Sequence, residues 1–115
     1  MIRRNVLAAP AAALVAFVSS TALTTPPQLE PVHAVHADGR NLEVRVRSNG
    51  CTDKSSFSVD VRRSGPEAVV ALHRVRRDLC RAYLRDGVLL IWSYDELSLA
   101  DGTPVVLANP IAPKR

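Results

Sequence analysis

The sequence predicts a small, mainly β domain: an antiparallel sheet or sandwich of about five to six strands, with one short helix and one disulfide. Apolar and polar residues alternate with a period of two in several short segments, as in strands with one buried face. Clusters of Gly, Pro, Asn and Asp separate these segments and are typical of turns. The chain has two cysteines, Cys51 and Cys80, which allow a single internal disulfide.

The first residues have the pattern of a bacterial export signal. Two arginines give a positive start, residues 6–18 form an apolar stretch, and the small residues Ser20 and Ala22 suit cleavage. The apolar stretch is shorter than the roughly 20 residues that span a membrane. We therefore expect residues 1–22 to be a signal peptide and the mature protein to be periplasmic or secreted, with the membrane as a partner only during export. A membrane anchor, a buried helix and twin-arginine export are the alternatives.

Removal of the signal peptide changes the charge balance. The full chain has 15 basic and 11 acidic residues and a net charge of +4, and the loss of the two arginines lowers it to +2. So small a surplus, with few aromatic residues for stacking, indicates no nucleic-acid partner. The remaining residues suffice for one small domain, which benefits from a covalent crosslink.

Residues 23–38 are rich in proline, which lacks an amide donor and favours extended chain. We expect a flexible linker here, with His33 and His36 solvated, followed by a single disulfide-stapled β domain over residues 39–115. In the alternative, a helical linker would let the two histidines share a metal ion.

The strand pattern begins inside the predicted domain. Residues 42–46 and 57–61 alternate between apolar and polar side chains, and residues 68–76 are rich in β-branched and apolar residues. We expect three strands at these places. Residues 67–85 also fit helical spacing, so a helix there stays open as an alternative.

Asp86-Gly87 is a strong hairpin signal, because both residues readily adopt positive φ. The flanking residues 81–85 and 88–92 are therefore expected to form two paired strands. Ser93 and Glu96 then have the spacing of a capping box and predict one or two helical turns. A last short strand is expected over residues 105–108, before an Asn-Pro pair ends it.

The export signal places Cys51 and Cys80 where disulfides persist. A crosslink between them should stabilise the fold by about 3 to 4 kcal/mol. Two free thiols are the alternative. Two cysteines without a neighbouring histidine pair fall short of the four ligands of a zinc site, so we expect neither a metal nor a cofactor.

Arginines are concentrated after the third predicted strand. Strand alternation would place Arg74 and Arg76 on one face, and Arg81 and Arg85 on one face of the next strand. Pairing of the two strands would create a basic face beside the disulfide. The planar fork of arginine suits carboxylate or phosphate, so an acidic protein or an envelope polyanion is the expected partner. An ordinary solvated face is the alternative.

Signals for catalysis are weak. His73 is the one histidine outside the predicted linker, and no serine or cysteine motif surrounds it. The adjacent carboxylates Asp95 and Glu96 are explained by the predicted helix cap. No catalytic residue is therefore assigned. A candidate binding loop is formed by Thr52, Asp53 and Lys54, where Thr52 and Asp53 would turn the chain.

Four short motifs occur in one order along the chain: Cys-Thr-x-Lys at 51–54, Asp-x-Cys at 78–80, Ser-x-x-Glu-Leu at 93–97 and Asn-Pro at 109–110. This pattern resembles a group of small exported bacterial proteins of uncharacterised function. The resemblance implies that both cysteines belong to one framework, and it implies no reaction, cofactor or catalytic residue.

The sequence thus favours an exported, non-enzymatic binding or structural domain whose ligand is unknown, with the arginine-rich face as its binding surface. One alternative is an inhibitor of an exported hydrolase, in which the rigid loop after Cys51 enters a foreign active site. A small hydrolase that uses His73 or carboxylates is the other alternative.

Overall fold

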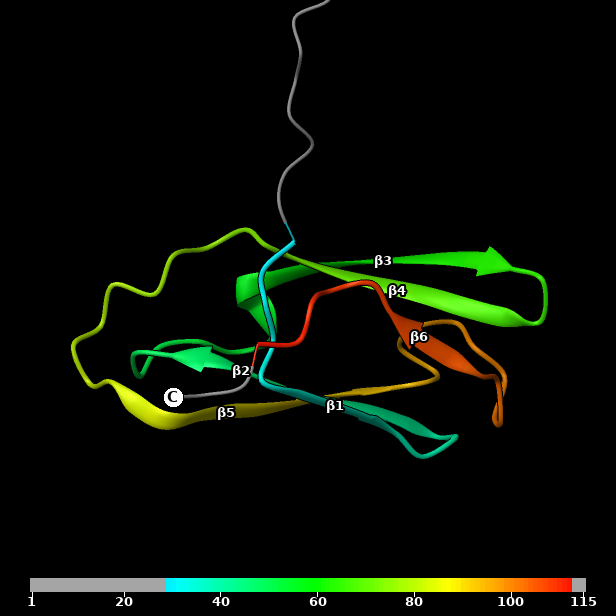
Figure 1. Cartoon of the computed structure of the whole chain (residues 1–115), viewed down its shortest axis with the longest axis horizontal. Coiled ribbons are helices and arrows are strands. Elements are labelled where there is room, and N and C mark those ends of the chain that lie inside the picture. Colours follow the sequence, from blue (N-terminus) through cyan, green and yellow to red (C-terminus); the bar gives the residue numbers. More distant parts are fainter. Residues whose placement is uncertain (1–28, 113–115) are drawn as a thin grey trace, which may run out of the picture.

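The structure is a computed structural model that describes residues 29–112. Two three-stranded sheets pack face to face as a sandwich (Figure 1), which confirms the predicted mainly β fold. The strand order is β1-β2-β5 in one sheet and β3-β4-β6 in the other, and β4–β6 is the one parallel pair among the described strands. The elements are β1 (Ala34–Ala37), β2 (Asn41–Ser48), the 3₁₀ helix η1 (Lys54–Ser56), β3 (Phe57–Ser64), β4 (Glu67–Arg74), β5 (Leu84–Ser93) and β6 (Val105–Leu107).

Alternating apolar residues explain why the two sheets stack. On β2, every second residue from Leu42 to Val46 is fully buried, and Ala68, Val70 and Leu72 are fully buried on β4. Burial of each of the larger side chains stabilises the fold by about 1.5 to 3 kcal/mol. This alternation also shows that the helical alternative for residues 67–85 is wrong.

The predicted hairpin at Asp86-Gly87 is wrong, because β5 runs through both residues and pairs with β2. Residues 85–87 stand opposite Arg47 alone, so they form a bulge. Gly87 has φ +68°, and a Cβ there would lie 2.1 Å from the carbonyl oxygen of Val46. The positive φ that Asp-Gly favours therefore serves a bulge in a single strand.

The predicted flexible linker is wrong from residue 30 onward, because the folded unit begins before Gly39. Val32 is fully buried, and its N–H donates to the carbonyl of Pro110 across 2.9 Å. The following β1 pairs antiparallel with β2 along its whole length. His33 lies here too, and its ring Nδ1 is 3.2 Å from the carbonyl oxygen of Ala112. The predicted signal peptide and the first linker residues lie outside the described part of the chain.

The predicted capping box is confirmed, and of the one or two predicted turns behind it a single turn is formed, too short to be a helix. Ser93 N–H donates to Glu96 Oε1 (3.0 Å), and Glu96 N–H donates to Ser93 Oγ (3.1 Å). After one turn, Leu99 N–H donates to the carbonyl of Tyr94 (2.8 Å), and Ser98 has φ +57°. This is the geometry that ends a helix, so the segment is a single closed turn.

No helix within residues 29–112 is long and apolar enough to cross a membrane.

Candidate functional site

The predicted disulfide between Cys51 and Cys80 is confirmed. It joins the loop that follows β2 to the long connection between β4 and β5, and the two Cα atoms are 5.7 Å apart. Both segments lie at the end of the sandwich where β5 begins (Figure 1). Residues 75–85, called the basic segment below, comprise this connection and the first two residues of β5.

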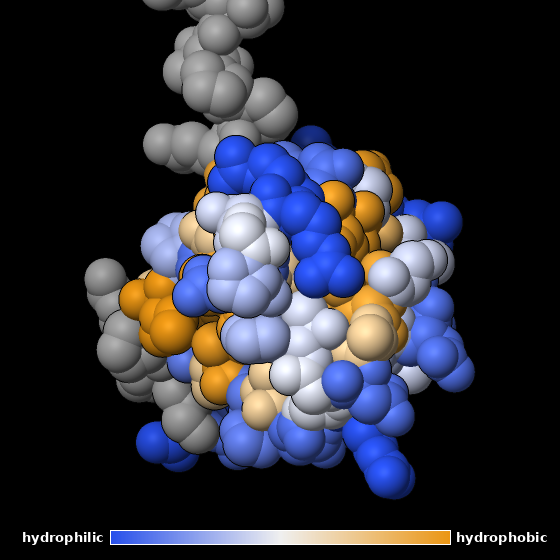
Figure 2. Space-filling model, turned by 90° about the vertical axis from the view of Figure 1, so that its right-hand side faces the viewer, coloured by the Kyte–Doolittle hydropathy of each residue, from blue (hydrophilic) through white to orange (hydrophobic). Residues whose placement is uncertain are grey.

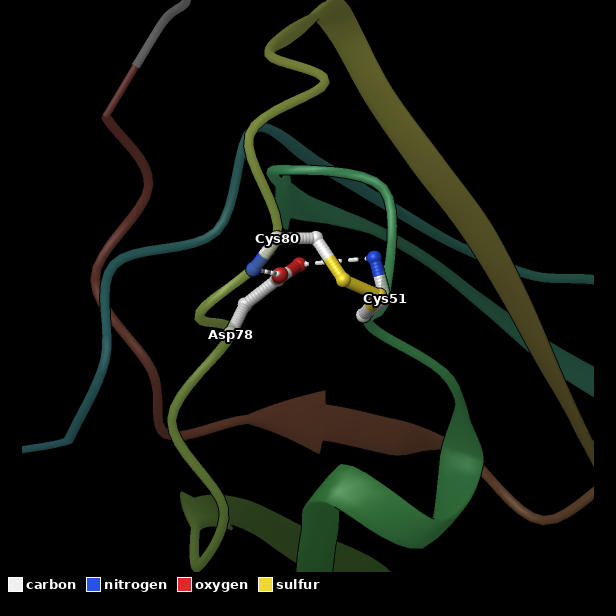
Figure 3. Close-up of side chains that lie close together, drawn as sticks. All are labelled: Cys51, Asp78 and Cys80. Atoms are coloured by element: carbon white, nitrogen blue, oxygen red, sulfur yellow. Dashed lines mark hydrogen bonds between the residues drawn. A yellow bond between two sulfur atoms is a disulfide. The ribbon is translucent and has the colours of Figure 1, made fainter.

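The carboxylate of Asp78 holds the same two segments together from within. Figure 3 shows it beside the disulfide, with hydrogen bonds from the backbone N–H groups of Cys51 (3.1 Å) and Cys80 (3.1 Å). Thr52 Oγ1 donates to it across 2.7 Å, and Asn49 N–H across 2.8 Å. The carboxylate thus fixes the centre of the basic segment against the loop after β2.

These contacts alter the protonation of Asp78. Partial burial raises its pKa, but the hydrogen bonds from Thr52 and from three backbone N–H groups outweigh burial and hold the pKa well below its usual range. Asp78, Cys51 and Cys80 are the one cluster of potential metal ligands in the described chain. Because the sulfurs are bonded to each other and the carboxylate accepts N–H and O–H donors, the cluster is a structural crosslink.

Arg74 is the second fixed point, and it is turned inward. Its side chain is 16% exposed, and it forms a two-pronged ion pair with Glu30, with an Nη2–Oε2 distance of 2.9 Å. All five of its N–H donors are used, since Nη1 and Nη2 also donate to Thr52 Oγ1 and to the carbonyls of Arg76 and Arg47. The guanidinium also lies 4.7 Å from the ring centre of Phe57. Arg74 therefore has no donor left for a partner.

The other predicted basic residues, Arg76, Arg81 and Arg85, are exposed. Residues 75–83 form an irregular loop, so strand alternation does not place these side chains as predicted. Arg76 Nη1 donates to Ser55 Oγ across 3.3 Å. Arg77 is exposed as well, and the pattern-based prediction missed it because a strand would have pointed it away from Arg76. None of the four has an ion pair with a residue within 29–112.

The basic segment also exposes apolar side chains, which sequence reasoning missed. Val75 is 65% exposed, Leu79 78% and Tyr83 67%, and Leu84 is exposed too. Leu79 points outward because both of its neighbours, Asp78 and Cys80, are held inward. No periodic pattern in the sequence signals this arrangement, since it depends on a loop crosslink.

A polar hollow of about 370 Å³ lies between the first half of the basic segment and the end of β2. Three arginines (Arg47, Arg74 and Arg77) and two carboxylates (Glu30 and Asp78) line it. Glu30 is paired with Arg74, and the carboxylate of Asp78 accepts hydrogen bonds from backbone N–H groups. The side chains of Arg47 and Arg77 have no ion pair among the described residues, so the hollow is suited to an anionic group.

The predicted loop Thr52, Asp53 and Lys54 is tied down. Thr52 is buried, and Asp53 caps η1 by accepting the N–H of Ser55 (2.9 Å). Lys54 Nζ donates to Glu96 Oε2 across 2.6 Å and lies over the ring of Trp92. This Lys54 contact, with the Ser93 N–H bond, holds the pKa of Glu96 below its usual value. The loop therefore packs against the turn after β5 and does not protrude.

His73 lies on the outer face of the sheet formed by β3 and β4. Its Nε2 is 3.2 Å from a carboxylate oxygen of Asp60, and Ser58 stands opposite it in the strand register. No hydrogen bond within the described part of the chain joins Ser58 to His73. A serine nucleophile needs that contact with its base, so the three residues do not form a catalytic set in this geometry.

No known protein family, curated protein or solved structure matches the chain. The resemblance to small exported bacterial proteins therefore stays a prediction.

Proposed function

We propose that the protein is an exported, non-enzymatic binding domain that contacts an acidic partner of the bacterial envelope through its basic segment. The observation that carries this proposal is the presence of four exposed arginines, Arg76, Arg77, Arg81 and Arg85, on a segment held by the disulfide and by Asp78. The sequence placed Arg74 on this surface, but Arg74 is turned inward, and Arg77 is exposed there instead. A guanidinium forms its strongest contacts with carboxylate and phosphate groups.

The rigidity of the basic segment supports a binding role. Asp78 and Cys80 are hydrogen-bonded or bonded to the loop after β2, and Ala82 N–H donates to the carbonyl of Asn49 (2.9 Å). Binding then orders less of the backbone, so less of the interaction free energy is lost. The hollow lined by Arg47 and Arg77 offers a place for one anionic group of the partner.

Export is the other part of the proposal. The disulfide supports it, because disulfides persist in oxidising compartments outside the cytoplasm. Cell fractionation followed by amino-terminal sequencing tests it: we expect the mature chain in the periplasm or medium, beginning at Leu23. Full-length protein that stays in the cytoplasm would contradict export.

Capture of partners from an envelope extract tests the binding role. The variant Arg76→Glu/Arg77→Glu/Arg81→Glu should lose the captured acidic component, whereas Arg62→Glu/Arg63→Glu, on exposed residues of β3, should retain it. Both variants change charge on exposed side chains, so both should fold. An identical set of captured components for the wild type and the basic-segment variant would remove the proposal.

An inhibitor of an exported hydrolase is the second candidate. The exposed, crosslinked basic segment favours it, with Leu79 as the most exposed of its apolar side chains. The loop from Thr52 to Lys54, which the sequence suggested for this role, is packed against the protein. Inhibition assays with trypsin-like, chymotrypsin-like and subtilisin-like enzymes test this candidate, with Leu79→Gly as the variant that should abolish any inhibition. If the wild type inhibits none of these enzymes, the inhibitor candidate is wrong and the binding role is the remaining proposal.

A further inference from the structure

We infer that the acidic partner is an anionic phospholipid surface, on which the basic segment docks with its apolar side chains in the interface and its arginines on the headgroup phosphates. This inference rests on the proposed function and deepens it. The sequence predicted the membrane as a partner only during export. According to this inference, the mature protein contacts a membrane after export as well.

The exposed apolar side chains carry the inference. Val75, Leu79 and Tyr83 are each about two thirds or more exposed, and Leu84 adds to them. Nothing in the described part of the chain covers them. A polysaccharide or another purely charged polymer would engage the arginines and leave these side chains in water. The headgroup region of a bilayer accepts aliphatic side chains and the amphipathic ring of tyrosine.

The fold prevents these side chains from turning inward. Leu79 lies between Asp78, whose carboxylate accepts the N–H of Cys80 at 3.1 Å, and Cys80, which is in the disulfide. The inward positions of the segment are occupied by these two residues. Exposure of Leu79 is therefore built into the crosslinked loop, and a surface that covers it gains its burial without a change of backbone.

The charges fit the same surface. Four exposed arginines occur among the apolar residues of the segment. Asp78 is the one acidic residue between Arg76 and Arg85, and its carboxylate accepts hydrogen bonds from Cys51 and Thr52. Each arginine near an anionic membrane surface strengthens binding by about fivefold. The combination of arginine with exposed aliphatic and tyrosine side chains is typical of segments that lie in a membrane interface.

A lipid surface fits the size of the segment better than a folded protein does. A stable protein interface uses about 20 to 30 residues on each side and needs a matching pocket for each large side chain. The basic segment spans residues 75–85 and is an irregular loop over most of its length. A fluid bilayer accepts such a shape without matching pockets.

Vesicle flotation tests the inference directly. The purified protein should float with vesicles of phosphatidylglycerol and phosphatidylcholine, and should stay in solution with vesicles of phosphatidylcholine alone. Leu79→Ser/Tyr83→Ser should weaken binding about tenfold or more, and Arg77→Gln/Arg81→Gln by about 20- to 30-fold. The matched controls, Leu89→Ser/Ile91→Ser on exposed residues of β5 and Arg62→Gln/Arg63→Gln, should bind as the wild type does.

The arginine control residues lie away from the basic segment. Arg62 and Arg63 precede the β3–β4 turn at the opposite end of the sandwich, the end that faces the viewer in Figure 2. That end is mainly hydrophilic, with hydrophobic residues in separate small areas. Thermal unfolding of each variant checks that the exposed substitutions leave the fold intact.

Fluorescence gives a second readout. Trp92 is buried and should give a constant background, so Tyr83→Trp adds an exposed reporter to the segment. Its emission should shift to shorter wavelength with phosphatidylglycerol vesicles and not with phosphatidylcholine vesicles.

The possible failures separate the two proposals. If the wild type does not bind anionic vesicles, or if Leu79→Ser/Tyr83→Ser binds them like the wild type, the lipid inference is wrong and the acidic partner of the proposed function stands. If the envelope extract yields an acidic protein whose capture depends on the segment, the partner is a protein and the lipid inference is likewise wrong. If the arginine variant neither weakens vesicle binding nor changes capture, both proposals are wrong.

Discussion

At the scale of single residues, Arg74 shows how far a side chain's role depends on distant parts of the chain. Its main partner, Glu30, lies 44 residues earlier, and its other acceptors come from β2, from the loop after β2 and from the basic segment. Strand alternation placed it beside Arg76 on an exposed face. No local pattern could reveal its true environment, because residue 30 fell inside a predicted flexible linker.

The first prediction concerns the replacement of Arg74 by lysine. A lysine keeps the charge but loses the planar fork and two of the five donors, and Glu30 is left half-paired in a largely buried place. We expect Arg74→Lys to lower the free energy of unfolding by about 2 to 3 kcal/mol, measured by urea denaturation. Arg77→Lys, on an exposed side chain, is the control and should change it by less than about 0.5 kcal/mol. Equal effects of the two variants would show that Arg74 is as dispensable as its neighbour.

At the scale of elements, the sequence predicts strands well where apolar and polar residues alternate. Residues of β2, β3 and β4 alternate clearly, so these strands were predicted near their observed places. The short β1 was missed, because the prolines before it suggested a linker and only pairing with β2 makes it a strand. The disulfide was predictable from the count of cysteines, but the Asp78 contacts beside it were not, since they join residues about 30 apart.

The second prediction concerns the bulge at Gly87. Both Gly87 (φ +68°) and Gly65 (φ +63°) have positive φ, but a Cβ at Gly87 would strike the carbonyl of Val46, whereas a Cβ at Gly65 meets nothing within 4 Å. Gly65→Ala should therefore lower the free energy of unfolding by about 1 kcal/mol, through backbone strain alone. Gly87→Ala should lower it by about 3 kcal/mol or more, because a clash is added.

Chemical denaturation of the two glycine variants measures this difference. It also decides between the bulge and the hairpin that the sequence suggested. In a two-residue hairpin turn, Gly87 would be solvent-exposed like Gly65, and the two alanine variants would cost the same.

At the scale of the whole molecule, acidic groups spread over four loops make stability depend on pH. The pKa values of Asp38, Asp53, Asp78 and Glu96 are all held below normal in the folded state, mainly by hydrogen bonds from nearby N–H, O–H and N⁺–H donors. The unfolded chain then binds protons more readily than the folded one, so acid favours unfolding. The stabilisation is present at neutral pH and is lost as the pH falls below about 5.

The third prediction follows from this charge pattern. The free energy of unfolding should be nearly constant from about pH 7 to pH 5 and should then fall steadily towards pH 2. Asp78→Asn should flatten this slope, because its carboxylate accepts hydrogen bonds from five groups. Asp95→Asn is the control, since the Asp95 carboxylate accepts none within the described chain. Urea denaturation at a series of pH values measures both, and a slope unchanged by Asp78→Asn would contradict the assigned contacts.

The fourth prediction concerns the disulfide, which crosslinks two loops just beyond Ser48 and Leu84, the last pair between β2 and β5. It connects the end of β2 in one sheet to the crossover that leaves β4 in the other, over a sequence separation of 29 residues. Cys51→Ser/Cys80→Ser should therefore lower the free energy of unfolding by about 3 to 4 kcal/mol, measured with urea against the oxidised wild type. Adding a reductant should destabilise the wild type by the same amount and leave the variant unchanged.

Thiol labelling of both cysteines in the folded, unreduced protein would contradict the crosslink. Because the same bond holds Leu79 outward beside Asp78, the variant should also bind anionic vesicles more weakly than the oxidised protein does, which connects the stability of the domain to its proposed binding surface.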